Sequence, residues 1–160
     1  MSQVEKNNIE ELHFENEPSE LDEATHAELL MMHNQSCTAI LFAKNLQWKT
    51  VGATLLVFGA NIAISHLSSE NSFLISVLGW FGILLVLAAI LVLCMYQAWQ
   101  FNETQKIVML EKHLSTLYRR VRDVKSRREG NYHRYTMLIM MVSVLIAAAF
   151  VSNTIIAHLL

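Results

Sequence analysis

The segment from residue 73 to residue 97 reads FLISVLGWFGILLVLAAILVLCMYQ and contains no Asp, Glu, Lys or Arg. A transmembrane helix needs about 17–25 predominantly apolar residues to cross the hydrocarbon core of a bilayer. The segment therefore predicts a membrane-spanning helix. Two other uncharged apolar segments, residues 51–67 and 135–159, predict a first and a third span. A short polar turn of residues 68–72 joins the first two spans.

The composition of the whole chain agrees with an integral membrane protein. Of the 160 residues, 53% are hydrophobic and only 16% are charged. Lys and Arg are absent between Lys49 and Lys106, and again after Arg134. We predict an all-α integral membrane protein with three transmembrane helices. A cytoplasmic N-terminal amphipathic helix precedes them, and a basic amphipathic helix lies between spans two and three.

The distribution of basic residues predicts the orientation. All 12 Lys and Arg lie before the first span or between the second and third spans. Cytoplasmic segments collect Lys and Arg, so we expect the N-terminus inside and the C-terminus outside. The bacterial inner membrane is the location we expect. Residues 1–26 are acidic and polar, so the first span is expected to act as its own insertion signal.

Two parts of the chain carry opposite charge. Residues 1–50 hold nine acidic residues and three lysines, whereas residues 96–135 hold nine Lys or Arg and four acidic residues. Such segments contact each other or an anionic surface. We expect residues 1–20 to be a disordered acidic tail. Residues 21–50 are expected to form an amphipathic helix that continues into the first span.

Residues 104–129 predict a basic amphipathic helix. Ile107, Leu110 and Leu114 begin an apolar series at steps of three and four, and Gly130-Asn131 ends the helix. We expect the basic residues to contact anionic lipid headgroups of the inner leaflet or the acidic tail. These residues are Lys112, Arg119, Arg120, Arg122, Lys125, Arg127 and Arg128.

The path of this helix is limited by distance. A straight helix from residue 100 to residue 128 would end about 43 Å below the membrane. Residues 129–131 span only about 10 Å when extended, too little to return to the interface. The helix therefore either turns near residues 101–104 and lies along the membrane, or folds back near Ser115-Thr116. Because no Gly or Pro marks the second position, we favour the helix in the membrane plane.

Small residues in the first two spans predict close helix contacts. Asp, Glu, Lys and Arg are absent from all three spans, so the usual groups for proton relays and voltage sensing are missing. Small side chains let helix backbones approach each other, and mild polar groups bond across the contact. Packing within one chain is the default expectation, and packing between copies is the alternative. The residues concerned are Gly52, Gly59, Asn61, Ala63, Gly79 and Gly82.

The chain contains no recognisable catalytic motif, and we expect no enzyme activity, cofactor, metal or nucleic-acid partner. The first hypothesis is a non-catalytic membrane protein that acts by association, either as a homo-oligomer or as an accessory subunit of a larger membrane complex. The alternative is a homo-oligomeric pore lined by Asn61, Ser65, Ser143 and Ser152. A remote third hypothesis is a redox subunit that holds haem or a metal with His66 and His158.

Overall fold

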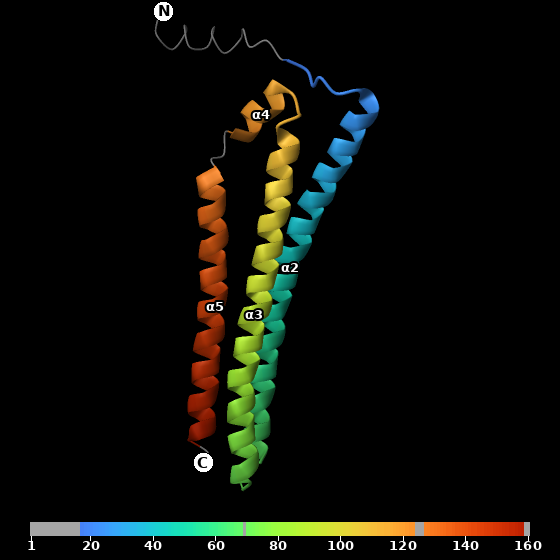
Figure 1. The fold of residues 1–160 in the computed structure, drawn as a ribbon. Coiled ribbons are helices and arrows are strands. Elements are labelled where there is room, and N and C mark those ends of the chain that lie inside the picture. Colours follow the sequence, from blue (N-terminus) through green and yellow to red (C-terminus); the bar gives the residue numbers. More distant parts are fainter. Residues whose placement is uncertain (1–16, 69, 124–126, 159–160) are drawn as a thin grey trace, which may run out of the picture.

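The computed structural model describes residues 17–68, 70–123 and 127–158. It contains helices α2 (Glu23–Leu67), α3 (Ser72–Glu111), α4 (Thr116–Asp123) and α5 (Arg127–Ala157). Among the described residues there is no strand, and α2, α3 and α5 run side by side while α4 lies across one end (Figure 1). The all-α class with three long apolar helices is confirmed.

Two of the three membrane-spanning helices are much longer than a bilayer requires. Helices α2, α3 and the part of α5 from Tyr132 to Ala157 are each long and apolar enough to cross a membrane. The 45 residues of α2 extend for roughly 67 Å and the 40 residues of α3 for roughly 60 Å, against about 30 Å of hydrocarbon core. The paired helices therefore project beyond the bilayer, on the side where α2 begins and α3 ends.

Side-chain caps fix where α2 and α3 begin. The Asp22 carboxylate accepts hydrogen bonds from the backbone N–H of Thr25 at 3.0 Å and from its hydroxyl at 2.7 Å. The Asn71 side chain accepts the backbone N–H of Leu74 at 3.1 Å at the start of α3. Such caps satisfy N–H groups that have no partner within the helix. Helix α2 then continues without interruption from the predicted amphipathic segment into the first span.

The cap at Asp22 predicts a response to acid. The bonds from Thr25 hold the pKa of Asp22 below its usual value of 3.8. A carboxylate whose pKa is lowered by folding stabilises the folded state fully above pH 3.8. This stabilisation is lost as the pH falls through the lowered pKa of the folded state. We expect amide hydrogen exchange in the first turn of α2 to accelerate below pH 3.8, beyond the intrinsic change in rate. Asp22→Asn keeps a capping oxygen without titrating, and an equal acid response in this variant would contradict the prediction.

The core of the bundle follows a spacing of three, four or seven residues along each helix. Side chains at this spacing form one stripe along each helix, and the three stripes pack against one another. Leu93 and Leu145 are completely buried at its centre. The core residues are Val51 and Phe58 of α2, Val86, Ala89 and Leu93 of α3, and Met141, Leu145 and Ala149 of α5.

The prediction of one helix over residues 104–129 in the membrane plane is wrong. Helix α3 passes through residues 101–104 without a break and ends at Glu111, and the separate helix α4 begins at Thr116. The chain turns at residues 112–115, where the Ser115 hydroxyl accepts the backbone N–H of Tyr118 at 3.3 Å. A serine cap thus starts a new helix without Gly or Pro. Since α5 already begins at Arg127, the chain returns through a helix from that residue and is not limited to residues 129–131.

Candidate functional site

Asn61 lies in the contact between α2 and α3. Its side chain is 3% exposed, and its Nδ2 donates to the carbonyl oxygen of Leu78 at 3.2 Å. A Cβ atom on Gly82 would lie 3.5 Å from Phe58 and 3.8 Å from Asn61. A Cβ atom on Gly79 would lie 3.8 Å from Asn153 of α5. The structure therefore buries Asn61 and Gly82 inside the bundle and places Gly79, which is half-buried, beside α5.

Three glutamines form a second polar contact near the end of the spans. Gln47 Nε2 donates to the carbonyl oxygen of Leu93 and to Gln97 Oε1, both at 3.3 Å. Gln100 Nε2 donates to Gln47 Oε1 at 2.8 Å. Gln47 and Gln100 are buried, so this network fixes the register of α2 against α3. This network was not predicted from the sequence, although Gln47 lies four residues from Ala43 and from Val51 on the buried stripe of α2.

A third polar cluster joins α4 to the projecting parts of α2 and α3. The Tyr118 hydroxyl lies 2.8 Å from His33 Nε2, and the two rings meet edge to face at 5.8 Å. His33 Nε2 is also 4.0 Å from the buried carboxylate of Glu111. Below this cluster, the Glu103 carboxylate accepts bonds from Ser36 at 2.9 Å and Lys106 at 2.7 Å. These contacts secure the turn at residues 112–115.

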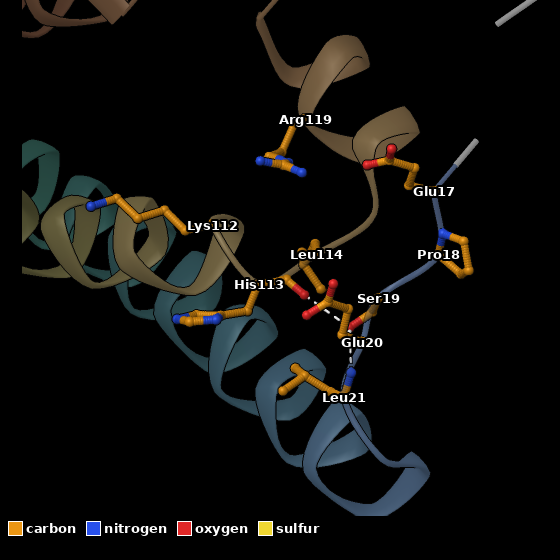
Figure 2. Close-up of a pocket in the computed structure, with 9 residues that line it drawn as sticks. All are labelled: Glu17, Pro18, Ser19, Glu20, Leu21, Lys112, His113, Leu114 and Arg119. Carbon is orange, nitrogen blue, oxygen red and sulfur yellow. Dashed lines mark hydrogen bonds between the residues drawn. The ribbon is translucent and has the colours of Figure 1, made fainter. Parts of the chain in front are cut away.

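The described end of the acidic tail lies against this turn. Glu17 exchanges two hydrogen bonds with Thr116, at 3.0 and 3.2 Å, and the Ser19 hydroxyl donates to the carbonyl oxygen of His113 at 2.9 Å. Figure 2 shows the acidic side chains of Glu17 and Glu20 around the same hollow as the basic groups of Lys112, His113 and Arg119. Arg120 is exposed on α4, and the side chains of Arg122, Lys125, Arg127 and Arg128 lie outside the described part of the structure, as do residues 1–16.

The remaining predicted packing residues lie on the outside of the chain. Gly52, Gly59 and Ala63 are exposed on α2. A Cβ atom added to Gly52 or Gly59 would have no atom within 4 Å beyond its own stretch of helix. The contact within one chain that we expected for these glycines is therefore wrong. We refer to Gly52, Gly59 and Ala63 as the small-residue face.

An open groove adjoins the small-residue face. It has a volume of about 520 Å³ and runs between α2 and α5, with Gly59 and Ala63 on one wall and Ile155 on the other. His66 and His158 also line it. Among the described residues, no group of three or more His, Cys, Asp or Glu side chains is placed to hold a metal ion. The groove is otherwise apolar.

In contrast to the small-residue face of α2, exposed large apolar side chains form a ridge along α3. Phe73 is 77% exposed, Trp80 is 68% exposed and Leu84 is 64% exposed. The members recur at steps of three and four, and they lie on the far side of α3 from its buried stripe. The α3 ridge consists of Phe73, Val77, Trp80, Leu84, Leu87 and Leu91.

Comparison with known proteins identifies the family. The model of the family described as "Octameric membrane protein family (8xMP)" matches residues 40–160. The chain belongs to this family. As a member of the octameric membrane protein family, it is a multi-pass, oligomeric membrane protein. No match was found among the curated proteins or the solved structures.

In an oligomeric family, residues that line a pore between copies must be exposed on the single chain. Of the four residues predicted to line a pore, Asn61, Ser65 and Ser152 are buried inside the single chain. The Ser65 hydroxyl donates to the carbonyl oxygen of Asn61 at 2.9 Å. Only Ser143 is exposed. The predicted lining is therefore wrong for three of its four members, because they fill the bundle interior.

Proposed function

We propose that the protein is a non-catalytic membrane scaffold that assembles as a homo-octamer through the small-residue face of α2. One observation carries this proposal. The open surroundings of Gly52 and Gly59 leave a flat helix face uncovered in a chain whose family is oligomeric. In a bilayer, helices associate through close backbone packing, and small residues make such packing available.

The α3 ridge of a neighbouring copy is the surface that we propose fits this face. A closed ring of identical copies requires two different complementary surfaces on each copy. The hydrogen bond from Asn61 to Leu78 places this part of α2 level with Trp80 of α3. The apolar groove beside Gly59 therefore lies at the same depth as the part of the ridge near the start of α3. We propose that Phe73, Val77 and Trp80 of one copy enter the groove of the next.

The proposed ring is not a water-filled channel. The exposed side chains of the spans are mostly large and apolar, with Ser76 and Ser143 among the few polar exceptions in the described part of the chain. An opening lined by such side chains favours lipid tails over water, because apolar surface is unfavourable in water. This observation supports a scaffold over the pore alternative.

The projecting helices are the part that we propose meets other proteins. Paired α2 and α3 extend beyond the bilayer at the end that carries the basic residues, which favours the cytoplasmic side. Eight copies would present eight such pairs around one axis. We propose a role as an accessory or assembly subunit in the bacterial inner membrane, with these pairs as the docking elements.

Native mass spectrometry after gentle extraction from native membranes tests the proposed function. We expect a particle with the mass of eight 18.3 kDa chains, with or without additional subunits. A stable single chain would contradict the proposal. A complex that holds one copy of this chain among other subunits would also contradict it.

A further inference from the structure

A small cleft lies where the three long helices leave the bilayer on the basic side. Lys44 of α2 and His133 and Arg134 of α5 line it, and no Asp or Glu is among its lining residues. Its volume is about 60 Å³. This is about twice the volume of one water molecule in the liquid, so the cleft accommodates a compact charged group. The positive charges of Lys44 and Arg134 favour an anion as the ligand of the cleft.

The cleft has a polar floor that is already ordered. Gln47, Gln97 and Gln100 line it, and they are the same glutamines that bond to one another between α2 and α3. Gln47 is 4% exposed and Gln100 is 1% exposed. Both N–H groups of Gln47 Nε2 are used within the protein, so the amide N–H groups of Gln97 and Gln100 are the ones that can donate to an anion. Because the glutamines are already ordered, little conformational entropy is lost on binding.

The cleft also has apolar lining residues. Trp48 is exposed, and Met137 and the buried Met141 come from the predicted third span. The position also fits the membrane–water interface, because Trp48 precedes the first predicted span and Gln97 ends the second. Tryptophan is enriched at this level of membrane proteins. A ligand that fits both parts has an anionic head and an apolar tail.

We propose that the cleft binds the phosphate group of an anionic membrane lipid. Lys44 and Arg134 pair with the phosphate oxygens, because a guanidinium group and an ammonium group both donate several hydrogen bonds to phosphate. The glutamine floor lies beneath the headgroup, and an acyl chain follows Trp48 and Met137. All the residues come from one chain, so this site does not depend on the proposed octamer. It is also separate from the basic residues predicted over residues 104–129.

Lipid binding to the full-length protein in detergent tests the site. We expect Lys44→Gln/Arg134→Gln to weaken binding of phosphatidylglycerol about tenfold or more, measured by native mass spectrometry of bound lipid. Lys49→Gln removes one charge at an exposed position outside the cleft, so it is the matched control for Lys44→Gln and should leave the affinity unchanged. If the double variant fails to fold, the single variant Lys44→Gln, at an exposed position, should still weaken binding several-fold.

Two further arms identify the source of the phosphate group. Inorganic phosphate should stabilise the lipid-free protein against heating much less than phosphatidylglycerol does. Equal stabilisation, lost in the cleft variant, would support a phosphate site but would overturn a lipid as its ligand. Equal loss of lipid binding in the cleft variant and in the control variant would overturn the proposed site itself.

Discussion

Gly59→Leu is expected to remove the eight-chain particle while the single chain stays folded. A Cβ atom at Gly59 meets nothing within 4 Å in the protomer, so we expect the single chain to accept a leucine at this open position. In the assembly, the same side chain would occupy the groove that the α3 ridge of the next copy enters. Native mass spectrometry should show single chains or small species, and circular dichroism should show unchanged helix content.

A matched control separates this effect from a general effect of added bulk. Ser143→Leu also places a leucine at an exposed small position of a span, but on α5 and outside the groove. We expect this variant to retain the eight-chain particle. If Gly59→Leu and Ser143→Leu both keep the assembly intact, the small-residue face is not the subunit interface.

Gly82→Leu is expected to have the opposite consequence, because this glycine lies inside the bundle. A Cβ atom there already meets Phe58 at 3.5 Å, Asn153 at 3.7 Å and Asn61 at 3.8 Å. The further carbons of leucine must displace these side chains, and overpacking of this kind costs about 1–3 kcal/mol. We expect the free energy of unfolding, measured by titration with a denaturing detergent, to fall by about that amount.

Gly82→Ala provides the graded comparison. Its single added carbon makes only ordinary van der Waals contacts at these distances, so we expect stability close to that of the original chain. A Gly82→Leu protein as stable as Gly82→Ala would show that α2, α3 and α5 do not pack closely at this level. It would also remove the reason for assigning Gly82 and Gly59 to different kinds of contact.

The spans were predictable because they depend on local composition. A run such as residues 73–97 has no charged residue, and its length alone matches a bilayer. The continuity of α2 from the amphipathic segment into the first span was predictable for a related reason. No Gly or Pro lies in residues 21–51, so nothing in the sequence there ends a helix.

The turn at residues 112–115 lies at the fold-back position that we kept as the alternative, and we ranked it second because we looked for Gly or Pro as the signal of a break. Ser115 caps α4 with its hydroxyl, and Leu114 is 6% exposed, so the turn is held by a cap and by burial. We also took the start of the third span as the start of its helix. Helix α5 begins at Arg127, well before that span, so the chain has more room to return.

The glutamine network and the contact between His33 and Tyr118 were missed because they depend on pairing between helices. The pairing of Gln47 with Gln100 and of His33 with Tyr118 can be predicted only when the register of the helices is known. Sequence spacing identifies the face of one helix but not the face that it meets. For the same reason the glycines of α2 were recognised as packing residues, while their position on the outside of the chain was not.

Cysteine cross-linking between two differently tagged copies tests the proposed interface most directly. One copy carries Gly59→Cys and the other carries Trp80→Cys, both in a background with Cys37→Ser and Cys94→Ser. We predict that oxidation in the membrane gives a linked dimer only when both copies are present. No link between the two copies, or an equal yield with Gly59→Cys alone, would contradict the seating of the α3 ridge in the groove beside α2.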